Sequence, residues 1–462
     1  MKHTLFRRKS ISQLLKASGE AKLKRTLGSF DLVMLGVGAI IGTGIFILPG
    51  TVAATYSGPS IIFSFIIAGI ACALAGMCYS EFSSSVPVTG SAYTYGYVVF
   101  GEIIAWLVAW ALVLEYGLAA ASVATGWSSY LTTLLEGFNI SLPTAISGPF
   151  NPAEGTYINV PAIGIILVIA FVLTFGIQES AKLNKIMVFV KVGVILLFIV
   201  VGIFYVQPEN WQPFMPFGVN GVFSGAAILF FAYLGFDAVS SAAEEVKNPQ
   251  RNMPIGIIGS LFVCTLLYVA VSLILTGIVP YNNLNVSDPV SFAMQFINQD
   301  WVAGMISLGA IVGMMTVILV LIYGGTRLLY ALGRDGLLPK WMSDVDKNQT
   351  PVKNTWFFAI LIAICAGFIP LSKLAELVNM GTLLAFTIVS IGIIYLRKDK
   401  TIPDGGFKVP FFPVLPIVSF LFCFFLITQL SLETWITSSI WFAVGLLFYF
   451  GYGKNHSLLN RD

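Results

Sequence analysis

Three ionisable residues, Glu115, Lys191 and Asp237, lie in the middle of otherwise apolar stretches of the chain. A charge at membrane depth is costly unless it meets a partner or a water-filled cavity. Carboxyl and amino groups in such a place pair with charged solutes or carry protons. Their types and positions therefore indicate a transport path through a membrane.

Each of the two acids also has a structural interpretation. Glu115 either faces the path and accepts a hydrogen bond or holds neighbouring helices together. Asp237 either serves the path or stabilises an interrupted helix by bonding free backbone N–H groups. The two histidines, His3 and His456, are in the terminal tails. Proton chemistry inside the membrane would therefore need a carboxyl group or a lysine.

The elements that position these residues are membrane-spanning helices. Of the 462 residues, 57% are hydrophobic and only 10% are charged, whereas soluble domains have about a quarter of their residues charged. At about 20 apolar residues per crossing, the chain divides into roughly twelve spans. We expect them to begin near Phe30, Pro59, Gly101, Asn159, Asn184, Gly221, Ile255, Trp301, Thr355, Ala375, Pro410 and Glu433. The predicted fold class is an all-α polytopic membrane protein.

The basic residues predict the orientation, because Lys and Arg concentrate in short cytoplasmic loops. If both termini are cytoplasmic, all 25 basic residues lie on the inner side except Lys191 and Arg327 inside spans and Lys373 outside. This predicts a multi-pass protein of the plasma membrane with cytoplasmic tails at 1–29 and 452–462. The basic first tail either lies along the membrane surface or is a plain solubilising segment.

The first span contains four glycines, at positions 36, 38, 42 and 44. Glycine inside a helix costs about 1 kcal/mol against alanine, so we expect an interruption around Gly42, Thr43 and Gly44. An interruption would free N–H groups at the start of the outer half-helix, where an anion such as a carboxylate is favoured. The alternative is tight helix packing through small residues.

The sixth span also has a glycine in its middle, Gly235, followed by Asp237. The sixth span comes five spans after the first, and this odd offset means that the two helices cross the membrane in opposite directions. Such a pair is typical of an inverted repeat of five helices with its binding site at the midplane. Freed carbonyls of the sixth span would face an ammonium group and freed amides of the first a carboxylate. A free α-amino acid carries both groups.

Four segments resemble a known family, the amino acid permeases of the amino acid, polyamine and organocation superfamily, in its cationic amino acid transporter branch. They are GAIIGTGIF (38–46), YSEFSSSVPVTGSAYTY (79–95), GFDAVSSAAEEVKNPQRNMP (235–254) and GRDGLLP (333–339). The resemblance implies the leucine-transporter fold. Its two inverted repeats would be 30–206 (spans 1–5) and 207–396 (spans 6–10), followed by two additional spans in 397–451.

The resemblance also implies site residues. Backbone amides of four consecutive residues would bind the substrate carboxylate: Gly42, Thr43, Gly44 and Ile45. Carbonyls at both interruptions would bind the amino group: Ile40, Ile41, Phe231, Ala232 and Leu234. Phe231 would also cover the substrate as an aromatic gate, against the alternative of ordinary packing.

Lys191, in the fifth span, resembles a lysine of related permeases whose ammonium group would occupy the place of a sodium ion near the interrupted first helix. In this interpretation the lysine loses its proton on the inward-facing side and regains it outside, so the resemblance favours protons over sodium. The alternative is a permanently charged lysine that pins helices or snorkels to the interface.

The sequence thus predicts a secondary active transporter that imports L-amino acids, by proton symport and with a preference for neutral or branched-chain side chains. Alternatives are an exchanger, a cationic amino acid transporter and, in a different class, an amino acid sensor that transports nothing. The predicted partners are the free amino acid, protons and the lipid bilayer, without nucleic acid. We expect no enzyme activity, cofactor or metal, because no catalytic pair, phosphate loop or metal-ligand spacing is present.

Overall fold

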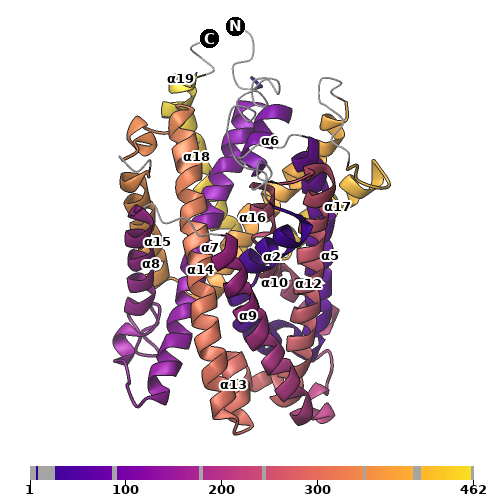
Figure 1. Ribbon diagram of the computed structural model, residues 1–462, viewed down its shortest axis with the longest axis vertical. Coiled ribbons are helices and arrows are strands. Elements are labelled where there is room, and N and C mark those ends of the chain that lie inside the picture. The colour runs from indigo at the N-terminus through magenta and orange to yellow at the C-terminus, as the bar shows by residue number, and fades with distance from the viewer. Residues whose placement is uncertain are drawn as a thin grey trace.

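A computed structural model describes residues 7–8, 27–85, 91–175, 181–241, 246–346, 350–398 and 407–458. Most of the predicted tail 1–29 and residues 459–462 lie outside this range. The described part of the chain is helical and contains isolated β-bridges but no strand. The helices form one elongated bundle (Figure 1).

Seven helical stretches are long and apolar enough to cross a membrane, and five shorter apolar helices accompany them. Each lies at one of the predicted spans, with its beginning moved by a few residues. The helices are α2 (Ser29–Ile40), α5 (Ile61–Ser85), α7 (Glu102–Gly137), α8 (Val160–Thr174), α9 (Ala181–Gly202), α10 (Gly218–Leu229), α12 (Pro249–Ile278), α14 (Asp300–Arg334), α15 (Val352–Phe368), α16 (Leu371–Leu396), α17 (Val414–Thr428) and α18 (Leu432–Phe448). Twelve crossings stay a prediction, because the five short helices are below the usual spanning length.

Smaller helices fill the connections and continue the interrupted spans. They are α3 (Thr43–Phe46), α4 (Leu48–Val52), α6 (Ser91–Val99), α11 (Phe236–Ser241), α13 (Pro289–Phe296) and α19 (Lys454–His456). A π-helical turn, Ala53–Ser57, follows α4, and a 3₁₀ turn, Phe230–Tyr233, follows α10. The first span is therefore α2 with α3 and α4, and the sixth is α10 with α11.

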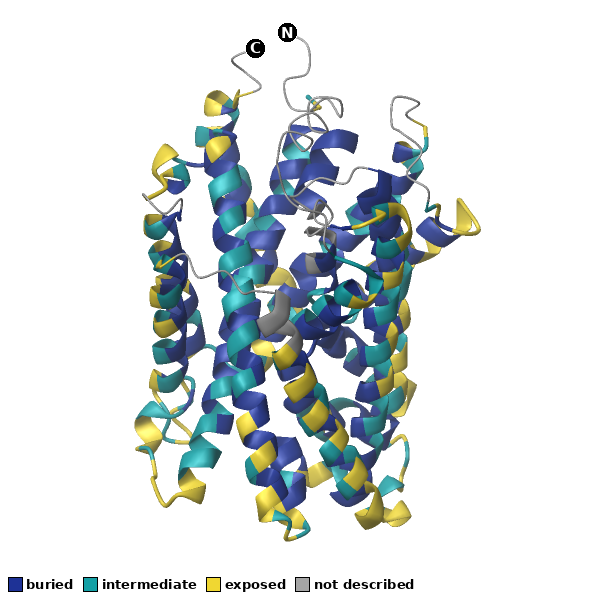
Figure 2. Cartoon of the chain, viewed as in Figure 1, coloured by how far each residue is buried: buried dark blue, intermediate teal, exposed yellow. Residues whose placement is uncertain are grey.

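The middle of the bundle is built around α7, which packs against both α14 and α16, while α12 packs against α2 and α5. Exposed residues lie along the outer sides of peripheral helices such as α9 and α12 (Figure 2). Many of them are large and apolar, for example Phe262 and Leu447, which are 70% and 74% exposed. Exposed apolar faces of this extent match a surface that meets lipid rather than water.

Both ends of the described chain meet at one end of the bundle. The backbone amide of Glu102 donates to Arg7 O, and Ser457 Oγ donates to Glu102 Oε2 at 2.6 Å. At the beginning of α2, Leu27 pairs with Val246 before α12. These residues are all predicted to be cytoplasmic, so their gathering at one end agrees with the predicted topology.

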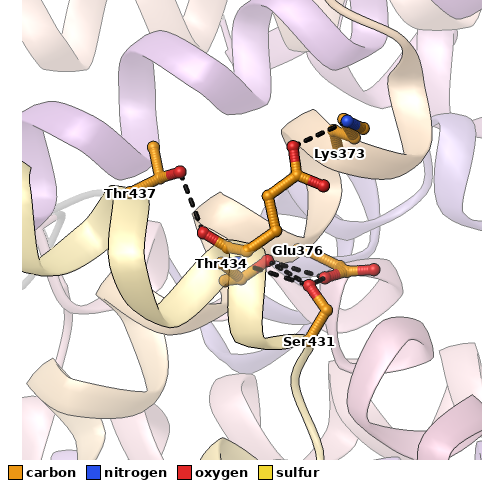
Figure 3. A network of polar contacts seen from close by, with 6 residues as sticks. Lys373, Glu376, Ser431, Thr434 and Thr437 are labelled. Atoms are coloured by element: carbon orange, nitrogen blue, oxygen red, sulfur yellow. Dashed lines mark hydrogen bonds and ion pairs between the residues drawn. The ribbon is translucent and has the colours of Figure 1, made fainter.

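Polar contacts join the ends of the helices. Glu81 of α5 and Arg397 beyond α16 form a two-pronged ion pair with distances of 2.6 and 2.7 Å. Figure 3 shows a second group, which joins the first turns of α16 and α18. There Glu376 Oε2 accepts hydrogen bonds from the hydroxyls of Ser431 and Thr434, each at 2.6 Å. Such contacts fix how neighbouring helices sit on one another at their ends.

Candidate functional site

The first interruption separates α2 from α3. Helix α2 ends at Ile40, Ile41 is extended (φ −74°, ψ 103°), and α3 begins at Thr43 after Gly42. Thr43 and Gly44, which we expected inside the interruption, are thus in the first turn of the outer helix. The first turn of a helix has no intrahelical acceptors for its amides, so these residues are helical and still present free N–H groups.

The second interruption separates α10 from α11. After the 3₁₀ turn that ends at Tyr233, Leu234 is extended (φ −60°, ψ 145°) and Gly235 has a φ of +107°. That backbone conformation is accessible to glycine and strained for other residues. A Cβ at Gly235 would also lie 2.8 Å from Ala39 O of α2. Glycine is therefore required here both for the turn and for the approach of the two interrupted helices.

The two interruptions touch each other. A Cβ at Gly44 would lie 2.5 Å from the Cα of Ala232, so the backbones there pack without room for a side chain. Tyr268 of α12 bridges them from the side: its hydroxyl donates to Ala232 O at 2.6 Å and lies 3.3 Å from Ile40 O. Our sequence analysis missed Tyr268. The available signal was a hydroxyl in an apolar span, where a buried tyrosine needs a partner.

Free hydrogen-bond donors gather at the beginning of α3. Among the described residues, the amides of Gly42, Thr43 and Gly44 have no backbone acceptor, while the amide of Ile45 donates to Gly42 O at 3.3 Å. The Thr43 hydroxyl is buried and has no hydrogen-bond partner among the residues that the structure describes. Buried polar groups are normally paired. Unpaired donors beside a cavity therefore indicate a place for an acceptor from outside the chain.

A cavity lies against these donors. Its lining comes from both interruptions, α7 and α14: Ala39, Ile40, Gly42, Thr43, Gly44, Glu115, Tyr116, Ala119, Val123, Phe231, Leu234, Gly235, Asp237, Val317, Val320 and Leu321. Its volume of about 40 Å³ has room for roughly three water molecules. The cavity is therefore small, and its walls must part before a larger solute can enter.

The structure brings most of the predicted site residues to this cavity. Ile40, Phe231 and Leu234 line it together with the amide-bearing residues of the first interruption. Ile41, Ile45 and Ala232 lie beside it but do not form its lining. The apolar wall from α7 and α14, which includes Val123 and Val317, was not in our prediction, because it depends on packing between distant spans.

The two predicted acids both reach the cavity. Glu115 of α7 and Asp237 of α11 are each 3% exposed. The Tyr116 hydroxyl is 3.4 Å from Asp237 Oδ2. Glu115 Oε2 has no hydrogen-bond partner within the described ranges. Both acids thus belong to the buried lining of the site.

Lys191 lies outside the lining, beside α2. Its Nζ donates to Gly38 O at 2.8 Å, and its aliphatic chain packs on Gly313 of α14. The side chain is only 1% exposed. A carbonyl near the end of α2 therefore accepts from this lysine three residues before the interruption. In the part of the chain that the structure describes, no group of three His, Cys, Asp or Glu residues could hold a metal ion.

A family profile described as amino acid permease matches residues 27–450. The chain belongs to the amino acid permease family. This permease is also similar to two proteins of Bacillus subtilis (strain 168) over nearly its whole length. One is a methylthioribose transporter, 55% identical over 99% of the chain and 100% of the relative. The other is the branched-chain amino acid permease BcaP, 50% identical over 100% of both chains.

A more distant relative is cationic amino acid transporter 4, vacuolar, of Arabidopsis thaliana, which is 32% identical over 99% of this permease and 97% of its own length. The family and these relatives confirm the predicted class: a multi-pass membrane transporter rather than an enzyme. The relatives carry three different substrate names, so the substrate of this permease has to be argued from its own site.

Proposed function

We propose that this permease imports neutral L-amino acids across the plasma membrane, preferring branched-chain or other apolar side chains, by proton symport. The observation that carries the proposal is the meeting of two interrupted helices at a small, largely apolar cavity. In the proposed alternating access, the two termini are cytoplasmic and residues 30–206 and 207–396 are the two inverted repeats.

Recognition of the amino acid backbone follows from the polarity of the interruptions. The free amides of Gly42, Thr43 and Gly44 supply donors for a carboxylate. Carbonyls of Ile40 and Leu234 at the cavity supply acceptors for an ammonium group. Both partners are charged, and charge-assisted hydrogen bonds are stronger than neutral ones. An α-amino acid fits because its two charged groups are one carbon apart.

The preference for an apolar side chain follows from the apolar side chains of the lining. Phe231, Val123 and Val317 offer no hydrogen bonds to a substrate side chain. A basic side chain would have to reach Glu115 or Asp237, which makes cationic amino acids the second candidate. A polar side chain left unpaired there would cost about 1 to 3 kcal/mol.

Proton coupling is proposed for Lys191. Its ammonium group already occupies the acceptor that Gly38 O offers near the end of α2. If this buried lysine is charged in one conformational state and neutral in the other, the strength of its hydrogen bond to α2 differs between the two states. This links protonation to the position of the interrupted helix without a sodium ion.

The similarity to a methylthioribose transporter supports a different candidate, a sugar with a thioether group and no zwitterion. Proteoliposome uptake of radiolabelled amino acids and methylthioribose, with and without an inward proton gradient, separates the candidates. We expect gradient-driven accumulation of leucine, isoleucine or valine. Uptake of methylthioribose alone would refute the amino acid proposal, and specific binding without flux would indicate a sensor.

Lys191→Ala tests the coupling. We expect this variant to lose gradient-driven accumulation while it still binds substrate and exchanges labelled for unlabelled amino acid. Lys353→Ala is the matched control, since Lys353 is exposed and, among the described residues, pairs only with Asp344 at the surface. If Lys191→Ala accumulates substrate like the wild type, Lys191 is structural. If accumulation by the wild-type protein does not depend on the proton gradient, an exchanger is favoured.

A further inference from the structure

Arg327 is a charged residue inside α14 that the proposed mechanism does not use. The same helix contributes Val317, Val320 and Leu321 to the cavity. At 1.5 Å per residue, the Cα of Arg327 lies about 10 Å beyond that of Val320 along the helix axis. It lies toward the end of α14 that faces the chain termini, which is the predicted cytoplasmic side.

The side chain of Arg327 leans back toward the cavity. Helical side chains point toward the N-terminal end of their helix, and the cavity is on that side of Arg327. The guanidinium carbon lies 5.0 Å from the ring centre of Tyr323, one turn nearer the cavity. Gly324 is at the same level, and a Cβ there would lie 3.4 Å from the ring of Tyr116, which lines the cavity. The guanidinium therefore lies near the turn of α14 that follows the lining residues Val320 and Leu321.

The charge of Arg327 lacks an acidic partner among the residues that the structure describes. Within the described ranges, Arg327 forms no ion pair, and its Nε is buried without any hydrogen-bond partner. By contrast, the other cation inside the spans, Lys191, donates to Gly38 O. A cation held at membrane depth is costly, and a lone contact with a tyrosine ring is worth only about 0.5 to 2 kcal/mol.

Snorkelling does not explain the arrangement. A snorkelling arginine directs its head group to the nearer membrane surface, which for Arg327 is toward the end of α14 at Arg334. The contact with Tyr323 shows that the side chain is directed the other way, toward the cavity. An unpaired guanidinium near a substrate cavity is instead suited to an anionic ligand that passes by.

We propose that Arg327 is a second contact for the carboxylate of the substrate, on the cytoplasmic side of the cavity. The carboxylate leaves the amides of Gly42 to Gly44 and is held by the guanidinium before release. Arginine suits this step, because its planar fork binds a carboxylate through two parallel hydrogen bonds. The inference rests on the proposed function, since it requires a substrate that has a carboxylate.

The test compares the two sides of the membrane in cells that lack their own leucine carriers, where all copies share one orientation. Uptake of radiolabelled leucine gives the KM at the outer side, and efflux from preloaded cells gives the KM at the inner side. For Arg327→Gln we expect the inner KM to rise about tenfold and the outer KM to stay within about twofold. Arg327→Lys keeps the charge and should recover most of the inner affinity. Arg334→Gln, an equal loss of charge at an exposed position of α14, should change neither KM.

Two results would overturn the inference while the proposed function stands. One is wild-type leucine transport with an unchanged inner KM in Arg327→Gln. The other is an equal rise of both KM values that Arg327→Lys does not reverse, because that would indicate a structural residue. A wild-type protein that moves methylthioribose but no amino acid removes the proposed function and this inference together.

Discussion

Gly44→Ala tests the contact between the two interruptions. The added methyl carbon would lie 2.5 Å from the Cα and 2.7 Å from the Cβ of Ala232. Carbon atoms pack at about 3.5 to 4.0 Å, so α3 and the 3₁₀ turn would have to separate by roughly 1 Å. Overpacking of this kind costs about 1 to 3 kcal/mol. The shift also moves the free amides of α3 away from the carbonyls they face across the cavity.

We therefore expect Gly44→Ala to lower the midpoint of thermal denaturation in detergent and to weaken leucine binding at least tenfold, about 1.4 kcal/mol. Gly193→Ala is the stability control, because no atom of the described residues lies within 4 Å of its added Cβ on α9. Gly42→Ala is the site control. Its Cβ would make ordinary contacts with the side chains of Val317, at 3.6 Å, and Val123, at 4.0 Å, so stability should hold while binding weakens. Wild-type stability and binding in Gly44→Ala would refute the contact.

Three further variants test the surroundings of the site. Tyr268→Phe leaves Ala232 O without its 2.6 Å hydrogen bond and should cost about 1 to 3 kcal/mol of stability, measured by thermal denaturation. Glu81→Gln leaves Arg397 unpaired and should destabilise the protein by about 3 kcal/mol, with charge reversal of both residues as a partial rescue. Burial raises the pKa of Asp288, in the loop before α13, from 3.8 to about 6. The neutral form of Asp288 is thus favoured in the folded protein. The free energy of unfolding is therefore highest below pH 4 and falls as the pH rises through 6, by at most about 3 kcal/mol. Asp288→Asn should remove this pH dependence from denaturation curves.

Two glycine-containing spans five positions apart in the order of spans predicted both interruptions. Glycine is a poor helix former, but it also serves tight helix packing, so it was the pairing of the first and sixth spans that favoured breaks. The observed breaks at Gly42 and Gly235 agree with that prediction. The shift of Thr43 and Gly44 into α3 is smaller than the usual uncertainty of helix ends.

Boundaries outside the membrane were predicted less well. The seventh span was expected to begin near Ile255, where the apolar run begins, but α12 begins at Pro249. Hydropathy detects only the part of a helix that lipid surrounds. The polar first turn of α12 extends beyond it, and its proline is well placed because the first helical residue needs no N–H acceptor.

Contacts between distant spans could not be predicted. Tyr268 lies 36 residues from Ala232, its hydrogen-bond partner, and 228 from Ile40. Nothing in the local pattern distinguishes its hydroxyl from those of other tyrosines in the spans. The direction of the Arg327 side chain could not be predicted for the same reason. The sequence places the charge inside a span but does not show which group the side chain contacts.

At the cavity, main-chain groups and side chains have different roles, and this is compatible with related permeases that have different named substrates. The groups that would bind an amino acid backbone are main-chain amides and carbonyls, which exist whatever side chains surround them. The side-chain wall, with Val123 and Val317, can then change without loss of the interruptions, because it comes from α7 and α14. Identities of 55% and 50% to relatives with different substrates are therefore compatible with one shared scaffold. A transporter for a solute without a zwitterion would have to satisfy the free amides of α3 by other acceptors, and those acceptors would have to come from the solute itself or from water.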